Sequence, residues 1–266
     1  MNVTAILYAV LTLGGLGLVF GAILNFADKI FHVPVDERVS LAREALPGAN
    51  CGACGYAGCD AFAEAVVNGT AHVNGCIPGG VSCANILAEI MGVKAEERKP
   101  MMARVYCQGE NGVAKQRYVY EGYRSCLLAA NMAGGPKCCT YACIGLGDCV
   151  AACKFDALTI ENGIAKVHED KCTACGMCAS LCPRHSIQLT PRNATVTVRC
   201  HNRDTAKAAR DACANACIGC MRCEKQCKVG AITMEDACAR IDFEKCTHCG
   251  ECAGVCPMKC ITVEGK

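Results

Sequence analysis

The residues of this chain that could do chemistry are its cysteines. Two runs near the C-terminus share the spacing C-x2-C-x2-C-x3-C, and they are Cys217, Cys220, Cys223 and Cys227, then Cys246, Cys249, Cys252 and Cys256. In this pattern three close thiolates bind three irons of a [4Fe–4S] cube, and the fourth cysteine of each run ligates the cube of the other run. The spacing therefore predicts two clusters, one on Cys217, Cys220, Cys223 and Cys256 and one on Cys246, Cys249, Cys252 and Cys227.

A second pair of runs lies earlier in the chain. The first is stretched (Cys139, Cys143, Cys149 and Cys153) and the second is regular (Cys172, Cys175, Cys178 and Cys182). The same rule assigns one cluster to Cys139, Cys143, Cys149 and Cys182, and another to Cys172, Cys175, Cys178 and Cys153. Cys138 is an alternative to Cys139 in the first position. Both first runs end in lysine, Lys154 and Lys228, where ferredoxins usually have proline; that proline is not a ligand.

A further group of four cysteines precedes both pairs, and its members are Cys51, Cys54, Cys59 and Cys76. A helix is predicted over 60–67, with Asp60 as its N-cap and Gly69 as its stop. The glycines between the first cysteines let the backbone approach a cluster. We expect a fifth [4Fe–4S] site here. Cys83 and Cys260 stand at no ligand spacing and are interpreted as buried packing thiols.

Four of the remaining cysteines lie in two similar phrases. Val105-x-Cys107 resembles Val198-x-Cys200, and each phrase ends in a cysteine shortly before a run. One hypothesis is a sixth cluster on Cys107, Cys126, Cys200 and Cys213. The alternative is that these are buried free thiols in two copies of one connecting element.

The composition narrows the class of protein. There are 28 cysteines among 266 residues, which in a short secreted chain would suggest disulfides. Structural zinc sites use pairs of ligands, and the triplets seen here favour iron–sulfur clusters in a reducing compartment. A formal net charge of +2 gives no electrostatic case for nucleic acid. No G-x-G-x-x-G follows a predicted strand, so no nicotinamide or flavin site is expected.

The elements that position these cysteines divide the chain into predicted parts. Residues 3–26 are almost wholly apolar and long enough to cross a bilayer, and basic residues follow but do not precede them, which places the rest of the chain in the cytoplasm. The fold class expected is α+β and iron–sulfur-rich. The parts are a transmembrane helix (1–27), a single-cluster domain (28–95), a connecting segment (96–137), a ferredoxin-like unit (138–190), a second connecting segment (191–212) and a second ferredoxin-like unit (213–266).

Basic residues lie near the cluster loops, and they are Lys154, Arg222, Lys225, Lys228, Lys245 and Lys259. They could dock an acidic ferredoxin by charge complementarity, or be ordinary solvated side chains. Five clusters without any other catalytic constellation indicate electron transfer.

The order of the motifs PGANCGACG, KCCTYACIGLGDCVAAC and CIGCMRC behind one membrane helix resembles the B subunit of the Rnf complex, the ion-translocating ferredoxin:NAD oxidoreductase. The resemblance covers essentially the whole chain. It implies a protein that accepts electrons from reduced ferredoxin and passes them to other redox subunits, coupled to Na+ or H+ export. Ala142, where the family often has glycine, is a departure.

Two other functions remain open at this point. One is a membrane-anchored polyferredoxin that serves a hydrogenase or another dehydrogenase without pumping, which the 51–76 group disfavours. The other is a metal-stabilised interaction module without redox activity, which the ferredoxin triplets disfavour.

Overall fold

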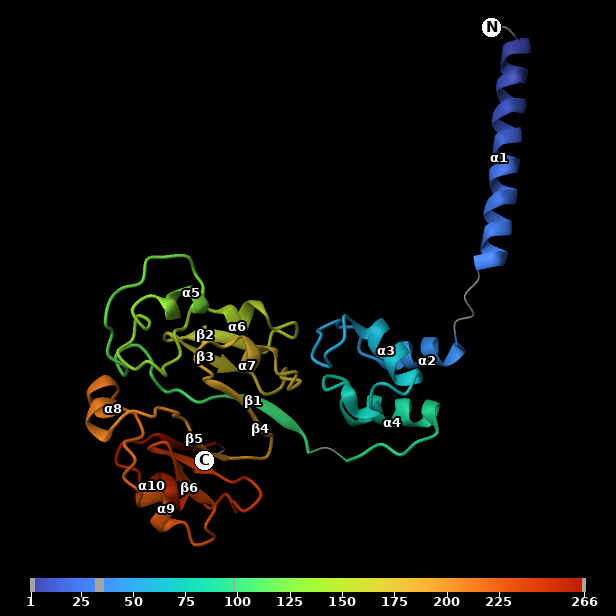
Figure 1. The fold of residues 1–266 in the computed structure, drawn as a ribbon. Coiled ribbons are helices and arrows are strands. Elements are labelled where there is room, and N and C mark those ends of the chain that lie inside the picture. Colours follow the sequence, from blue (N-terminus) through green and yellow to red (C-terminus); the bar gives the residue numbers. More distant parts are fainter. Residues whose placement is uncertain (1–2, 32–35, 98, 265–266) are drawn as a thin grey trace.

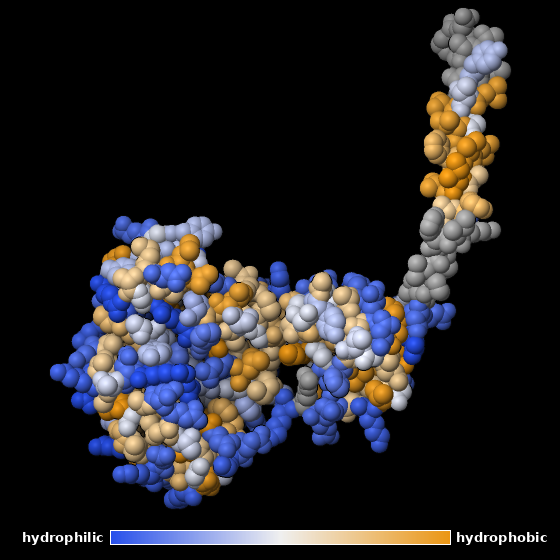
Figure 2. Space-filling model, viewed as in Figure 1, coloured by the Kyte–Doolittle hydropathy of each residue, from blue (hydrophilic) through white to orange (hydrophobic). Residues whose placement is uncertain are grey.

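The computed structural model describes residues 3–31, 36–97 and 99–264. Residues 32–35, near the start of the predicted single-cluster domain (28–95), lie outside them. Helix α1 (Val3–Phe31) stands apart from the rest of the molecule, and its surface is apolar along its middle (Figures 1 and 2). No residue of its window Val10–Ala27 is buried, and the window is long and apolar enough to cross a membrane. The described chain thus has an apolar helix where the sequence predicts one.

The next part is a small helical domain. Its elements are α2 (Glu37–Ala45), α3 (Cys59–Val67), the 3-10 turn η1 (Val73–Gly75) and α4 (Gly80–Met91). Phe62, Val66 and Leu87 are its largest fully buried apolar side chains and hold the helices together. The predicted stop at Gly69 is confirmed by its φ of +72°. The predicted cap is wrong, because Gly58 precedes α3 and Asp60 instead pairs with Nε of Arg43 at 2.7 Å.

The first ferredoxin-like unit is built from two antiparallel strand pairs and short helices. Its elements are β1 (Met101–Val105), α5 (Cys126–Asn131), α6 (Asp148–Ala151), β2 (Leu158–Glu161), β3 (Ile164–Val167), α7 (Met177–Leu181) and β4 (Ile187–Pro191). β2 pairs with β3, and β1 pairs with β4 in the register Met101↔Pro191 to Val105↔Ile187. The segment that joins the helical domain to this unit therefore contributes one of its strands.

The second unit repeats this plan. Its elements are β5 (Val196–Val198), α8 (Ala206–Ala212), α9 (Arg222–Gln226), β6 (Ile232–Glu235), β7 (Cys238–Ile241), α10 (Glu251–Gly254) and β8 (Ile261–Val263). β5 pairs with β8 and β6 with β7, as β1 pairs with β4 and β2 with β3. From Cys143 and Cys217 onward, equivalent elements stand at a constant separation in sequence. The two units are copies of one supersecondary motif.

Backbone hydrogen bonds join the two units side by side. The N–H of Lys115 donates to the carbonyl of Ala212, and the N–H of Ala214 donates to the carbonyl of Val113. A buried imidazole adds to this contact, because the two ring nitrogens of His201 lie 2.8 and 2.9 Å from the carbonyl oxygens of Tyr106 and Arg184. Figure 1 shows the second unit beside the first, with the helical domain on the other side of β1.

Candidate iron–sulfur centres

In the second unit the cysteines gather in two places. The first holds one predicted group in full, and in the second the fourth ligand, Cys227, stays a prediction. The first group lines one small cavity and is called site 4; its members are Cys217, Cys220, Cys223 and Cys256. The second group is called site 5; its members are Cys227, Cys246, Cys249 and Cys252. Cys252 lies close to the thiols of Cys246 and Cys249, and Cys227 packs in the same core. The crossed arrangement follows from the packing of α9 against α10.

In the first unit, the group expected on the regular run also comes together. It is called site 2, and its members are Cys153, Cys172, Cys175 and Cys178. Burial raises the pKa of the Cys178 thiol to about 12, and the nearby thiolates of the other three members add to this shift. A buried thiol with so high a pKa stays protonated unless a metal replaces the proton, so cluster insertion and proton release are coupled here.

The remaining group of the first unit corrects one assignment. A cavity beside α6 is lined by four cysteines, called site 3; they are Cys126, Cys143, Cys149 and Cys182. Burial raises the pKa of Cys149 to about 12, and Cys143, Cys126 and Cys182 are among the thiolates that raise it further. Cys139 does not line this cavity. The stretched run lacks a counterpart of Cys220, and Cys126 at the start of α5 stands in that place.

Cys139 lies in a different cavity, between the two units. That cavity is lined by four cysteines, called the bridging group; they are Cys107, Cys139, Cys200 and Cys213. The sequence-based group for an extra cluster had Cys126 in place of Cys139, and this is the second half of the same correction. The two groups exchange one member because hydrogen bonds from Ser125 and Leu127 to Asp148 hold α5 against α6. Cys139 instead accepts a hydrogen bond from Asn202 of the second unit.

Site 1 lies in the helical domain, and its members are Cys51, Cys54, Cys59 and Cys76. Cys54, Cys59 and Cys76 pack in one core, and the side chain of Asn50 accepts a hydrogen bond from the N–H of Cys59 at 2.8 Å. Cys83 on α4 is buried beside them. Its thiol donates to the sulfur of Cys76, which lowers the pKa of Cys76 to about 7. The interpretation of Cys83 as a packing thiol misses this contact with a ligand.

Backbone N–H groups aimed at sulfur are the second feature that fits iron–sulfur clusters. Ala157 donates to Cys153 Sγ at 3.4 Å, and its repeat equivalent Ala231 donates to Cys227 Sγ at 3.3 Å. Ala165 donates to Cys143 Sγ at 3.4 Å. Hydrogen bonds to the sulfurs stabilise the negative charge of a cluster and set its potential.

Similarity to known proteins extends over almost the whole chain. A "putative Fe-S cluster" family model matches residues 46–78, and a "4Fe-4S dicluster domain" model matches residues 142–186 and 216–260. The B subunit of the Na+-translocating ferredoxin:NAD+ oxidoreductase complex of Acetobacterium woodii is 48% identical over 97% of this chain and 78% of that protein. The B subunit of the ion-translocating oxidoreductase complex of Methanosarcina acetivorans is 39% identical over 97% of this chain and 98% of that protein.

This chain belongs to the B-subunit family of ion-translocating (Rnf) oxidoreductase complexes. Members of this Rnf family are iron–sulfur electron-transfer subunits of a membrane-associated complex. A further relative, from Clostridium ljungdahlii, is named as the B subunit of a proton-translocating complex and is 37% identical over 98% of this chain and 93% of that protein. The named relatives therefore include both sodium and proton translocators, so membership in the family does not fix the ion.

A buried lysine, Lys137, lies between the cysteine groups, and the sequence did not predict its role. It is 3% exposed, and its Nζ donates to the carbonyls of Gly109, Cys143 and Gly163 at 2.7, 2.7 and 2.8 Å. Burial lowers the pKa of Lys137, and the thiolates around it oppose that shift. This Rnf-family chain therefore holds a cation in its interior, between site 3 and the bridging group.

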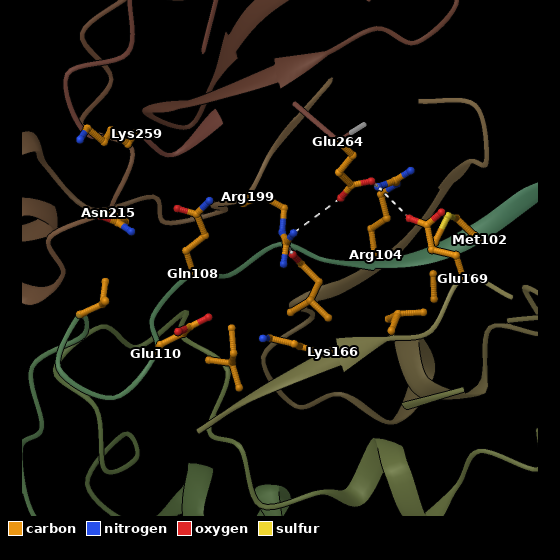
Figure 3. Close-up of a pocket in the computed structure, with 15 residues that line it drawn as sticks. Met102, Arg104, Gln108, Glu110, Lys166, Glu169, Arg199, Asn215, Lys259 and Glu264 are labelled. Carbon is orange, nitrogen blue, oxygen red and sulfur yellow. Dashed lines mark hydrogen bonds and ion pairs between the residues drawn. The ribbon is translucent and has the colours of Figure 1, made fainter. Parts of the chain in front are cut away.

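The space between the two units also forms a charged cleft of about 500 Å³ (Figure 3). Arg104, 5% exposed, contacts the carboxylate of Glu264, and the guanidinium of Arg199 lies 3.8 Å from the same carboxylate. Arg199 also donates from Nε to the carbonyl of Val105 at 2.6 Å. Because these residues lie on or directly after β1, β5 and β8, the charge network fixes the two strand pairs of the Rnf-family chain relative to each other.

Among the described residues, no three His, Cys, Asp or Glu side chains converge as the ligands of a single metal ion would. All of the cysteines are free of disulfides. Thiols instead line small cavities, with four cysteines at site 3, four in the bridging group and five at site 4, where Cys260 joins the predicted four. Backbone N–H groups donate to several of the sulfurs. The residues present therefore fit [4Fe–4S] clusters.

Proposed function

We propose that this chain conducts electrons from reduced ferredoxin to other subunits of an Rnf-type complex through [4Fe–4S] clusters at sites 1 to 5. Each cluster supplies one-electron redox chemistry when bound. The protein's own part is to hold the cubes at fixed separations, to donate N–H groups to their sulfurs and to keep water from them. Ferredoxin gives up each electron and is oxidised, and NAD+ on another subunit is the final acceptor.

The observation that carries this proposal is the spatial order of the sites. Cys220 of site 4 and Cys249 of site 5 are exposed, so the far end of the second unit offers an entry point near the surface. At the other end, Cys76 of site 1 and Cys172 of site 2 line one cavity of about 400 Å³. The main cause of the raised pKa of Cys175 is burial, and the thiolate of Cys51 adds to it, which also supports closeness of these two sites.

The surroundings of the exposed end favour a negatively charged donor. Arg222, Lys225 and Lys228 are exposed on and after α9. Lys228 contacts Glu251 of α10 at 3.0 Å, which leaves Arg222 and Lys225 to present net positive charge. Exposed charges of this kind raise association rates and lose their effect at high salt. The direction proposed for the electrons is therefore from the second unit towards the helical domain and α1.

The same proposal places the chain on a membrane. Helix α1 would be the anchor, with the cluster-bearing parts on the cytoplasmic side, because basic residues follow the apolar stretch and none precedes it. Electron flow through the partner subunits would be coupled to export of Na+ or H+.

The test is electron entry into the full chain, purified in detergent without oxygen. Chemically reduced ferredoxin is mixed with the oxidised protein in a stopped-flow instrument, and the bleaching of its clusters is followed. We expect fast, salt-sensitive reduction. The double variant Arg222→Glu, Lys225→Glu should slow it by about tenfold at low salt, whereas Lys94→Glu, an exposed lysine just after α4, should not. No reduction by ferredoxin in the parent would defeat the proposal.

A second measurement tests whether the chain works within an ion-translocating membrane complex. Affinity purification from membranes should recover integral-membrane partners, and sealed vesicles containing the assembly should take up ²²Na+ or acidify when reduced ferredoxin and NAD+ are added. Ferredoxin oxidation with no such partners and no ion uptake would instead identify a polyferredoxin that serves another enzyme.

A further inference from the structure

The bridging group has the make-up of a cluster site that neither ferredoxin-like unit contains alone. Cys107 and Cys139 come from the first unit, and Cys200 and Cys213 come from the second. Each is less than a tenth exposed. All four thiols line one cavity on the boundary between the units.

The two units contribute equivalent residues to this cavity. Cys107 follows β1 and Cys200 follows β5, each two residues beyond a buried valine of its strand. Cys139 precedes Cys143 by the same spacing as Cys213 precedes Cys217. The bridging group is therefore two copies of one cysteine pair, related by the internal repeat. Chance placement of unrelated packing thiols would not give this correspondence.

The hydrogen bonds on the sulfurs repeat in the same way. The N–H of Cys143 donates to Cys107 Sγ at 3.3 Å, and the N–H of Cys217 donates to Cys200 Sγ at 3.3 Å. The N–H of Gly109 donates to Cys107 Sγ at 3.2 Å, and the side chain of Asn202 donates to Cys139 Sγ at 3.3 Å. A packing thiol needs no such donors, whereas a cluster thiolate does.

From this geometry we infer that Cys107, Cys139, Cys200 and Cys213 hold a sixth [4Fe–4S] cluster, shared between the two ferredoxin-like units. Four thiolates with N–H donors suit an iron–sulfur cube. The inference builds on the proposed function, but the cluster can be present whether or not ferredoxin is the donor.

The position of the bridging group indicates a path for electrons between the two units. Two of the three backbone donors named above belong to cysteines of the neighbouring sites, Cys143 of site 3 and Cys217 of site 4. The bridging cluster therefore stands directly between sites 3 and 4. Cys107, Cys139, Cys200 and Cys213 would hold the cluster there, and a cluster so placed would supply a one-electron step between the two neighbouring sites.

The first experiment is an iron and acid-labile sulfide count on the full chain, purified anaerobically in detergent. Six cubes require about 24 iron and 24 sulfide per chain, and five require about 20. Cys107→Ala and Cys213→Ala should each lower the count to about 20. Cys138→Ala should leave it at the parent value, because Cys138 neighbours Cys139 but does not line the cavity.

Double variants then test which cysteines share a cluster. Cys107→Ala with Cys139→Ala should lose about 4 iron in total, because both remove the same cube. Cys107→Ala with Cys126→Ala should lose about 8, because Cys126 belongs to site 3. The reverse result would overturn the grouping, and a parent count of 20 would overturn the cluster itself, even if every variant failed to fold. One zinc per chain in place of the extra iron would also overturn it.

Discussion

The N–H of Cys143 points at the sulfur of Cys107, 3.3 Å away, although the two residues line different cavities. In the proposed arrangement, Cys143 would bind iron at site 3 through its side chain and would stabilise the bridging cluster through its backbone N–H. A change in the charge of one cluster would then shift the reduction potential of the other, so the potentials of the two clusters should be coupled.

Asn202 is the side chain best placed to tune the bridging cluster alone. It is 1% exposed, and its amide donates to Cys139 Sγ at 3.3 Å. Asn202→Ala removes a donor that stabilises the reduced, more negative cluster, so its reduction potential should fall by about 40 mV for each 1 kcal/mol lost. Asn202→Asp should lower it further, because a negative charge replaces the donor. The measurement is an EPR-monitored redox titration with an iron count that stays unchanged.

Lys137→Met should lower the reduction potentials of the neighbouring clusters and the stability of the folded protein. The substitution removes a buried cation between site 3 and the bridging site and leaves three carbonyls without their donor. We expect a loss of about 2–4 kcal/mol in the free energy of unfolding. Thermal melting under anaerobic conditions measures it. Lys115→Met, an exposed lysine of the same segment, is the control, and equal losses in both variants would contradict this role for Lys137.

Gly145 is required where the site 3 loop crosses the β2–β3 turn. Its φ is +82°, and an added methyl group would clash with the carbonyl oxygen of Gly163, an acceptor for Lys137. Gly145→Ala should cost about 2–4 kcal/mol and reduce iron at site 3. Gly230→Ala has a similar φ of +61° and open space, so it should cost only about 1 kcal/mol. Equal melting temperatures for the two variants would show that the clash is not decisive.

The variant Cys83→Ala tests whether Cys83 is itself a cluster ligand or only donates a hydrogen bond to the ligand Cys76. The parent iron count should be kept, because Cys83 contacts Cys76 by a hydrogen bond and is outside the spacing of site 1. The reduction potential of site 1 should fall modestly when this donor is removed. Cys76→Ala, by contrast, should lose about 4 iron per chain. An equal iron loss in both variants would make Cys83 the ligand that we assign to Cys76.

Sequence spacing predicted the parts of the fold that are governed by local rules. The regular runs predict sites 2, 4 and 5, because each ligand triplet lies within one loop and the fourth cysteine comes from the other run of the same unit at a set distance. The apolar length of 3–26 fixed α1, and Gly69 marked the end of α3. The division of the chain into domains at the predicted residue boundaries stays a prediction.

The sequence did not predict where the stretched run finds its missing ligand. Cys126 and Cys139 both precede Cys143 in the chain, and only the folding of α5 back onto α6 separates their roles. One signal was available: the equal spacing from Cys139 to Cys143 and from Cys213 to Cys217. That spacing shows that Cys139 corresponds to Cys213 and not to a ferredoxin ligand. Lys137 carried no such signal, because its role depends on carbonyls from three separate loops.

The pairing of cysteines from both halves of the chain has a consequence for biogenesis. Cys107 and Cys139 leave the ribosome long before Cys200 and Cys213 are made. In the proposed arrangement, the first unit can receive its own two cubes during synthesis, but the shared cube can be inserted only after the last quarter of the polypeptide has folded against it. Maturation would therefore be ordered in time, and a chain truncated before Cys200 would bind iron but would lack the cube that links its two units.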